Sequence, residues 1–304
     1  MKKFFEAQWP EVFLLVIITI LIIVWFKSGM VLGTGESGLP FYNSSQLFFR
    51  NRYAWADVII GSPTNQPGWP FLAFISAGQA LHLPLFLIQA AFYWLIIVVG
   101  ILSVTKLSRF LSSNNLAAFL AGGFYLFNLF TLVSVVNRML YPFLFIYAWL
   151  PLGLVILIQA FKTYRLSLAV LLSLISLPFS LAFASFPLLE LWWGVVLLWC
   201  IYTAIINNQN RLFSLKFFLL SLISWVLVHL WWFGPLLIST FSSSYASMEA
   251  VTTQGNIQAF SALSNLVGGT SYVLSFIDRS FFSSTSAAWG KFYLNPVVQF
   301  IALI

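Results

Sequence analysis

The stretch PLFLIQAAFYWLIIVVGILSV, residues 84–104, decides the class of fold, because it carries no charged side chain over a length that can cross a membrane. A transmembrane helix needs about 20 predominantly apolar residues. The run is continuous rather than alternating, which predicts a helix and not a strand of a barrel. Comparable runs lie near residues 11–26, 116–136, 140–161, 166–186, 188–206 and 215–239, and another begins near Asn295. We therefore predict an all-α fold, a polytopic bundle of transmembrane helices.

The composition excludes a soluble globular domain. Hydrophobic residues make up 61% of the 304 residues and charged residues 7%, whereas soluble domains carry about 25% charged residues. The net charge of +7 comes from Lys and Arg that lie mostly in short connections between the apolar runs. It therefore predicts orientation in the membrane and no nucleic-acid partner. Cys200 lies inside an apolar run, and we interpret it as a buried structural thiol.

The basic residues alternate along the chain in a way that predicts its topology. Four short segments carry Lys2 and Lys3, Lys106 and Arg109, Lys162 and Arg165, and Arg211 and Lys216. The positive-inside rule places these segments and the N-terminus in the cytoplasm. The first long loop (27–68) and a polar segment (240–294) then lie on the extracytoplasmic face of a single transmembrane domain, 1–304. Long polar loops carry function more often than spans do, so we expect an external site.

Two helices are predicted near the first loop. Residues Ser44 to Trp55 place Leu47 and Phe48 against Arg50 and neighbouring polar residues, a pattern typical of an amphipathic helix in the membrane interface. The apolar segment 69–82 predicts a helix that feeds the second span.

Two parts of the first loop could carry chemistry. Glu36 lies in GTGESGLP, residues 33–40, where glycines allow a ligand to approach closely and a carboxylate can act as a general base or bind a metal. The alternative is an ordinary solvated acid in a turn. Trp55, Asp57, Asn65 and Gln66 follow, and amides beside an aromatic ring suit sugar binding. An interfacial aromatic belt explains the same residues equally well.

Two further positions stand out near or within the spans. Arg138 lies at the predicted outer end of a span, where it could bind a lipid phosphate or extend to the headgroup level. His229 lies inside the run 215–239. An ionisable residue within the membrane is a functional hypothesis, but we prefer a neutral His bonded to a neighbouring helix.

The layout of the first loop resembles that of the GT-C superfamily of membrane glycosyltransferases, and most closely the bacterial arabinofuranosyltransferases of the mycobacterial type. The resemblance covers residues 1–105 and is topological beyond them. The residues that carry it are Glu36, Leu39, Pro40, Phe48, Arg50, Trp55, Asp57, Gly61, Asn65, Gln66 and Pro70. The resemblance implies a GT-C-like bundle and a catalytic or metal-contacting acid, which by position is Glu36. Many relatives have Asp there.

The resemblance implies transfer of a sugar, with arabinofuranose as a candidate, from a polyprenyl-phosphate donor to an envelope glycan, lipid or protein acceptor. Glu36 would deprotonate the acceptor hydroxyl, and Arg50, Arg52 and Arg138 are candidates to stabilise the leaving phosphate. A divalent cation is a candidate cofactor. The alternative function is a transporter or flippase of lipid-linked envelope precursors. The family has more spans than this chain, so we expect the chain to be an N-terminal fragment of a longer protein.

Overall fold

The computed structural model describes residues 2–32, 41, 44–53, 55–56, 62–63, 66–128, 131, 141–206 and 211–241. The chain forms two compact units, Met1–Leu236 and Leu237–Ile304. The described part of the second unit is the end of one helix, and the fold below is that of the first unit. The predicted polar segment 240–294 lies outside the described residues except for its first two positions, and the run near Asn295 lies wholly outside them.

Among the described residues, six helical segments are long and apolar enough to cross a membrane. They are Gln8–Phe26 of α1 (Lys2–Phe26), α4 (Leu85–Leu111), α6 (Tyr141–Thr163), Ser167–Ala184, Pro187–Ile206 of α8 (Phe186–Ile206) and Arg211–Ile238 of α9 (Arg211–Phe241). All six coincide with predicted runs. The seventh run, 116–136, contains the shorter helix α5 (Asn115–Phe127), and most of its second half lies outside the described residues.

Local sequence explains where several helices begin and change. The side chain of Asn114 accepts a hydrogen bond from the Leu116 N–H at 2.8 Å and so caps α5. Gln8 of α1 has non-helical backbone angles two residues before Pro10. The predicted helix 166–186 is α7 (Ser167–Ser176) followed by the 3₁₀ helix η3 (Leu177–Ala184), which begins beside Pro178.

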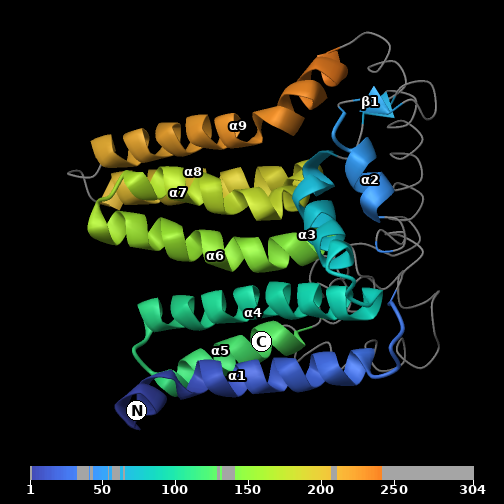
Figure 1. The fold of residues 1–304 in the computed structure, drawn as a ribbon. Coiled ribbons are helices and arrows are strands. Elements are labelled where there is room, and N and C mark those ends of the chain that lie inside the picture. The colour runs from blue at the N-terminus through green and yellow to red at the C-terminus, as the bar shows by residue number, and fades with distance from the viewer. Residues whose placement is uncertain are drawn as a thin grey trace, which may run out of the picture. The chain divides into compact units, whose positions relative to one another are not determined.

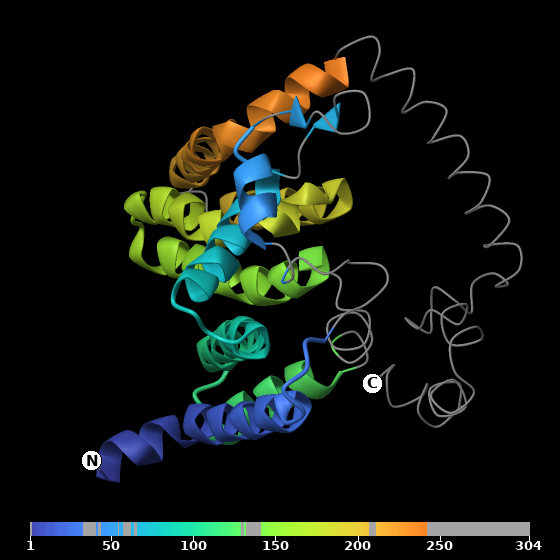
Figure 2. The same cartoon turned by 45° about the vertical axis from the view of Figure 1, so that its right-hand side comes forward.

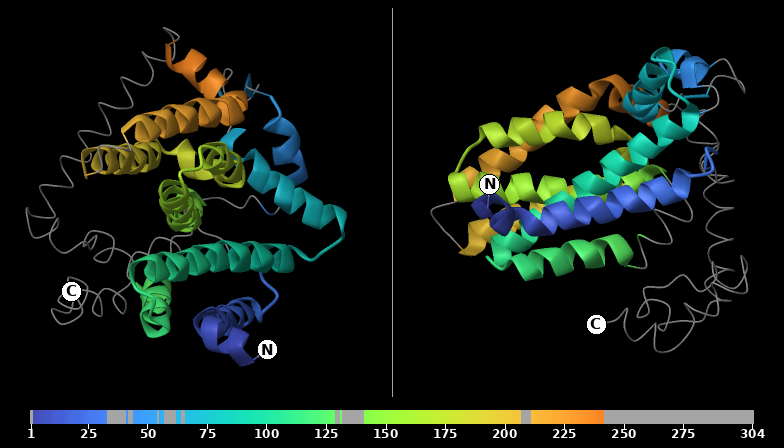
Figure 3. Two further views of the ribbon diagram at one scale, coloured as in Figure 1. Left: turned by 90° about the vertical axis from the view of Figure 1, so that its left-hand side faces the viewer. Right: turned by 60° about the horizontal axis from the view of Figure 1, so that its bottom comes forward.

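Helix α4 lies at the centre of the unit, in contact with α1, α5 and α6. Beyond α6 come α7, η3 and α8, with α9 at the far side (Figures 1 and 3). The direction of the chain alternates from α4 to α9, and the shorter helix α5 returns it between the parallel spans α4 and α6. The ends that carry Lys106, Lys162 and Arg211 therefore gather at one end of the bundle. The helices α2 (Ser44–Arg50) and α3 (Trp69–Ala80) lie at the other end (Figure 1). This arrangement agrees with the predicted alternation of the basic segments along the chain.

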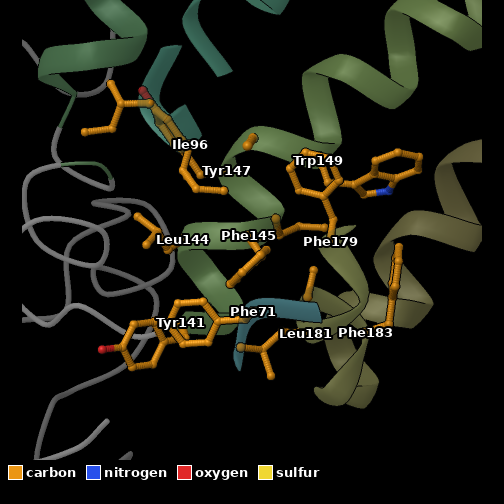
Figure 4. Packing of buried hydrophobic residues seen from close by; sticks show 14 of the residues in the cluster. Phe71, Ile96, Tyr141, Leu144, Phe145, Tyr147, Trp149, Phe179, Leu181 and Phe183 are labelled. Atoms are coloured by element: carbon orange, nitrogen blue, oxygen red, sulfur yellow. The ribbon is translucent and has the colours of Figure 1, made fainter. Parts of the chain in front are cut away.

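Aromatic side chains and glycines determine how closely the central helices pack. Phe145 of α6 lies between Phe71 of α3 and Phe179 of η3, with ring centroids 5.7 and 6.3 Å away (Figure 4). Gly153 of α6 faces Trp192 of α8, and a Cβ at Gly153 would lie 2.3 Å from the indole. Small residues at such crossings let two helices approach closely in a membrane.

Part of the prediction for the first loop is wrong. The amphipathic helix predicted over Ser44–Trp55 ends at Arg50, and Trp55 belongs to the strand β1 (Trp55–Ala56). This strand pairs antiparallel with β2 (Ser62–Pro63), with Trp55 opposite Pro63. Leu47 and Phe48 are half-buried on the helix as predicted. The helix predicted over 69–82 is confirmed as α3, which follows the 3₁₀ turn η1 (Gln66–Gly68).

Candidate functional site

The structure describes only some of the residues predicted to form the site. Glu36, Asp57, Asn65 and Arg138 lie outside the described residues, so their roles stay predictions. For Trp55 and Gln66 it gives the backbone, in β1 and at the start of η1. Arg50 and Arg52 are both described and exposed, at the end of α2 and just after it.

A cavity of about 860 Å³ lies beside the end of α2, and we call it the groove. Three stretches far apart in sequence supply its lining: the end of the α2 region with α3, the start of η3, and α9. The lining residues are Asn51, Arg52, Trp69, Pro70, Ala73, Phe74, Leu177, Pro178, Val228 and Trp231. Eight of these ten side chains are apolar or aromatic, and the remaining two, Asn51 and Arg52, come from the loop.

The aromatic side chains hold the loop against the spans at the groove. Phe48 of α2 stacks on Trp69 of α3, with centroids 5.0 Å apart. Trp69 in turn meets Trp231 of α9 edge-on at 6.1 Å, and Figure 2 shows α2 and α3 crossing the ends of the neighbouring helices. The Ser180 hydroxyl of η3 donates to the Pro67 carbonyl at 2.6 Å, so the turn before α3 is attached to the same region.

Arg52 supplies the positive charge of the groove. Its guanidinium lies 5.1 Å from the ring centre of Phe48 and 4.4 Å from that of Phe49. A cation over aromatic faces is held without losing its hydrogen-bond donors at the edge. An exposed Arg whose position is fixed in this way, beside an apolar cavity, suits an amphiphile that has a phosphate and a hydrocarbon chain.

A buried polar seam between α7 and α9 sets the far wall of the groove. We define the seam as Ser173, Ser176, Ser224 and His229. His229 Nε2 lies 2.8 Å from Ser176 Oγ, and Trp232 Nε1 donates to His229 Nδ1 at 2.9 Å. The hydroxyls of Ser173 and Ser224 are 2.7 Å apart. The prediction that His229 bonds to a neighbouring helix is confirmed.

The seam also reveals the tautomer of His229. The Trp232 indole can only donate, so Nδ1 must accept, and the proton of the neutral ring is on Nε2. Nε2–H then donates to Ser176 Oγ, whose own hydroxyl donates to the Ser173 carbonyl at 2.7 Å. Ser176 precedes Leu177 and Pro178, and His229 follows Val228, so the bond fixes two walls of the groove relative to each other.

Sequence reasoning missed most of the groove. Trp69, Phe74 and Trp231 are apolar residues within apolar runs, and in a membrane protein such residues pack in the core, face lipid or line a cavity without any difference in sequence. Arg52 was named as a phosphate ligand, and His229 as a polar group bonded between helices. One sequence signal could have indicated the position of the groove. Ser176, which can form a hydrogen bond, and Pro178, which disturbs a helix, lie two residues apart in the same span.

Comparison of the chain with known protein families, with curated proteins and with solved structures finds no match. These comparisons identify no family, and the chain is a multi-pass membrane protein by the six long apolar helices within its described ranges. Within the described ranges, no three His, Cys, Asp or Glu side chains are grouped so that they could hold a metal ion. Glu36 and Asp57 lie outside those ranges.

Proposed function

We propose that this chain is a membrane glycosyltransferase that moves a sugar from a polyprenyl-phosphate donor to an envelope glycan, lipid or protein acceptor on the extracytoplasmic face. The observation that carries the proposal is the groove, an apolar cavity with Arg52 at one side and the end of α2 beside it. An isoprenoid chain needs an apolar cavity of this kind, and its phosphate needs a cation at the end of it.

The two chemical parts of the donor, its hydrocarbon chain and its phosphate, would contact different residues of the groove. The hydrocarbon chain would lie against Trp69, Phe74 and Trp231, and the phosphate would meet the Arg52 guanidinium. Trp69 Nε1 is buried and has no hydrogen-bond partner among the described residues. An oxygen of the phosphate or the sugar would satisfy this donor, and an unsatisfied buried N–H is otherwise costly.

The chemistry that we propose follows the resemblance of the first loop. Glu36 takes the proton of the acceptor hydroxyl as its oxygen attacks the anomeric carbon. The bond between that carbon and the phosphate oxygen breaks, and the polyprenyl phosphate leaves with an added negative charge. Arg52 stabilises this charge electrostatically. Arg50 and Arg138 remain further candidates for the same role.

The experiment that tests the proposal is a transfer assay on the protein reconstituted in lipid bilayers, with a radiolabelled polyprenyl-phosphate sugar. We expect Glu36→Gln to lower the rate by a factor of about 100 or more, because the general base is removed while the shape is kept. Full transfer by Glu36→Gln at a normal protein level would remove Glu36 from the mechanism.

A second pair of variants tests the groove. Arg52→Ala should raise the donor KM about fivefold, the effect of losing an exposed charge-assisted contact. The donor KM of Arg52→Lys should lie between those of the parent protein and Arg52→Ala, because lysine keeps the charge and loses the planar guanidinium. The matched control is Lys216→Ala, an exposed cation at the other end of the bundle. An equal change in the control would mean that general charge, and not the groove, controls donor binding.

The alternative function is a transporter or flippase of lipid-linked precursors, for which a lipid groove would also be useful. A transport path needs polar groups accessible within the membrane. The polar groups of the seam instead bond to one another and are buried, with Ser176 and His229 at 0% exposure. Movement of a fluorescent lipid-linked precursor across vesicles, without sugar transfer, would favour the alternative.

A further inference from the structure

Gln89 binds both backbone groups of a single residue in the first loop. It lies in the first turns of α4 and is fully buried. Its Oε1 accepts from the Leu32 N–H at 2.7 Å, and its Nε2 donates to the Leu32 carbonyl at 2.6 Å. The side-chain amide of Gln89 thus pairs with the Leu32 backbone as the peptide groups of a neighbouring strand would. A buried amide within an apolar span is costly without partners, and here both of its ends are satisfied by Leu32.

Gln79 makes an equivalent attachment a few residues further along the loop. It lies near the end of α3, and its Nε2 donates to the Phe41 carbonyl at 3.0 Å. Its Oε1 accepts from the hydroxyls of Ser44 and Ser45 at the start of α2. Phe41 is fully buried, and its ring lies 5.8 Å from that of Phe71 in α3. Phe41 and the start of α2 are therefore attached to α3.

The two glutamines belong to one hairpin, which fixes their separation. The turn between α3 and α4 is closed by the Leu83 N–H, which donates to the Gly78 carbonyl at 3.1 Å. His82 in this turn has a φ of 55°. Gly78 lies so close to α4 that a Cβ there would be 2.8 Å from Ile88 Cγ1. Leu32 and Phe41 are thus attached to a single rigid support.

The residues between these attachments are 33–40, the segment that contains Glu36. We infer that Gln79 and Gln89 are positioning residues, which fix both ends of this segment and so determine where Glu36 can reach. A short connection between two fixed ends has far fewer conformations than one with a free end. The role of Glu36 rests on the proposed function, whereas the attachment of the two ends does not.

The first measurement tests the attachment alone. Cys200, the only cysteine, is replaced by Ala, and a nitroxide spin label is placed through Ser37→Cys. We expect Gln89→Leu and Gln79→Leu each to shorten the rotational correlation time of the label at least twofold. Ser103→Ala is the matched control, because Ser103 is also buried in α4 but donates only to Val99 of its own helix, at 2.7 Å. An unchanged label in both glutamine variants overturns the inference.

The second measurement is the transfer assay, read as separate values of kcat and KM. For Gln89→Leu, release of the segment should lower kcat about tenfold or more and leave the donor KM within about twofold, because Gln89 bonds to Leu32 and not to the α2 region that lines the groove. Gln79→Leu also detaches the start of α2, so the KM criterion is applied to Gln89→Leu alone. A purely structural role would lower the amount of folded protein and leave kcat per folded molecule unchanged. That result would overturn the inference. Gln89→Asn and Gln79→Asn, each one methylene shorter, serve where the leucine variants do not fold.

The two proposals fail in different ways. If the reconstituted parent protein transfers no sugar while the label responds to the glutamine variants, the proposed function fails and the attachment stands. If Glu36→Gln is inactive while the rotational correlation time of the label is unchanged in both glutamine variants, the positioning role fails and the proposed function stands.

Discussion

At the scale of single residues, His229 joins two spans and aligns two walls of the groove. His229→Leu removes the acceptor of the Trp232 indole and the partner of Ser176. We expect the free energy of unfolding to fall by about 1 kcal/mol, typical of one to two interhelical hydrogen bonds in a membrane protein. Because Val228 and Trp231 line the groove, the donor KM should rise more than kcat falls.

Unfolding of the reconstituted protein, followed by tryptophan fluorescence, measures the stability change. Thr19→Ala is the control, because the Thr19 hydroxyl donates within α1 and its contact with another helix, to Trp94, is exposed. A His229→Leu variant as stable as the parent would show that the seam holds without its histidine.

Residue-level prediction from sequence succeeds where a side chain is unusual for its surroundings. Cys200 is buried as predicted, and the partner of His229 lies on another helix as predicted. The roles of Gln79 and Gln89 could not be predicted, because each depends on the backbone of a loop residue that sequence does not place beside it. Trp69 could not be assigned to a groove, because the identity of an apolar residue does not indicate whether its side chain faces the core, lipid or a cavity.

At the scale of helices, the crossing of α6 and α8 depends on Gly153. A methyl group there would overlap the Trp192 indole, which is 1% exposed and packs on Trp149 at 5.0 Å. We expect Gly153→Ala to lower the free energy of unfolding by about 1–3 kcal/mol, the usual effect of overpacking. Gly194→Ala in α8 is the control, because a Cβ there meets nothing within 4 Å. Equal losses in the two variants would refute close packing as the cause.

The positions of six spans were predicted correctly, because a long uncharged run in lipid can satisfy its backbone hydrogen bonds only by forming a helix. The prediction was wrong where tertiary contacts decide the outcome. The helix from Ser44 was predicted to reach Trp55, but it ends at Arg50, where Arg52 turns back over Phe48 and Phe49. The irregular continuation of α7 as η3 begins at Leu177–Pro178, whereas the prediction was one uninterrupted helix over 166–186 despite the signal of Pro178.

At the scale of the whole molecule, the basic connections between the spans and the groove lie at opposite ends of the bundle. Arg109 joins three helices at the cationic end: its guanidinium binds both carboxylate oxygens of Glu11, at 2.6 and 2.8 Å, and reaches Asn115 at 3.2 Å. The groove is built at the other end from segments near residues 51–74, 177–178 and 228–231. No single stretch of sequence contains it, which is why it could not be predicted.

The proposed chemistry requires the cationic end to face the cytoplasm, and this can be measured with the Cys200→Ala chain. Ser113→Cys places an exposed thiol between α4 and α5, and Met30→Cys places one after α1, at the opposite end. We expect a membrane-impermeant maleimide to label Met30→Cys in intact cells, and Ser113→Cys only after the membrane is permeabilised. The reverse pattern would place residues 33–40 and Arg52 in the cytoplasm. An extracytoplasmic lipid-linked donor could not then meet Glu36, and the glycosyltransferase proposal would fail with the topology on which it depends.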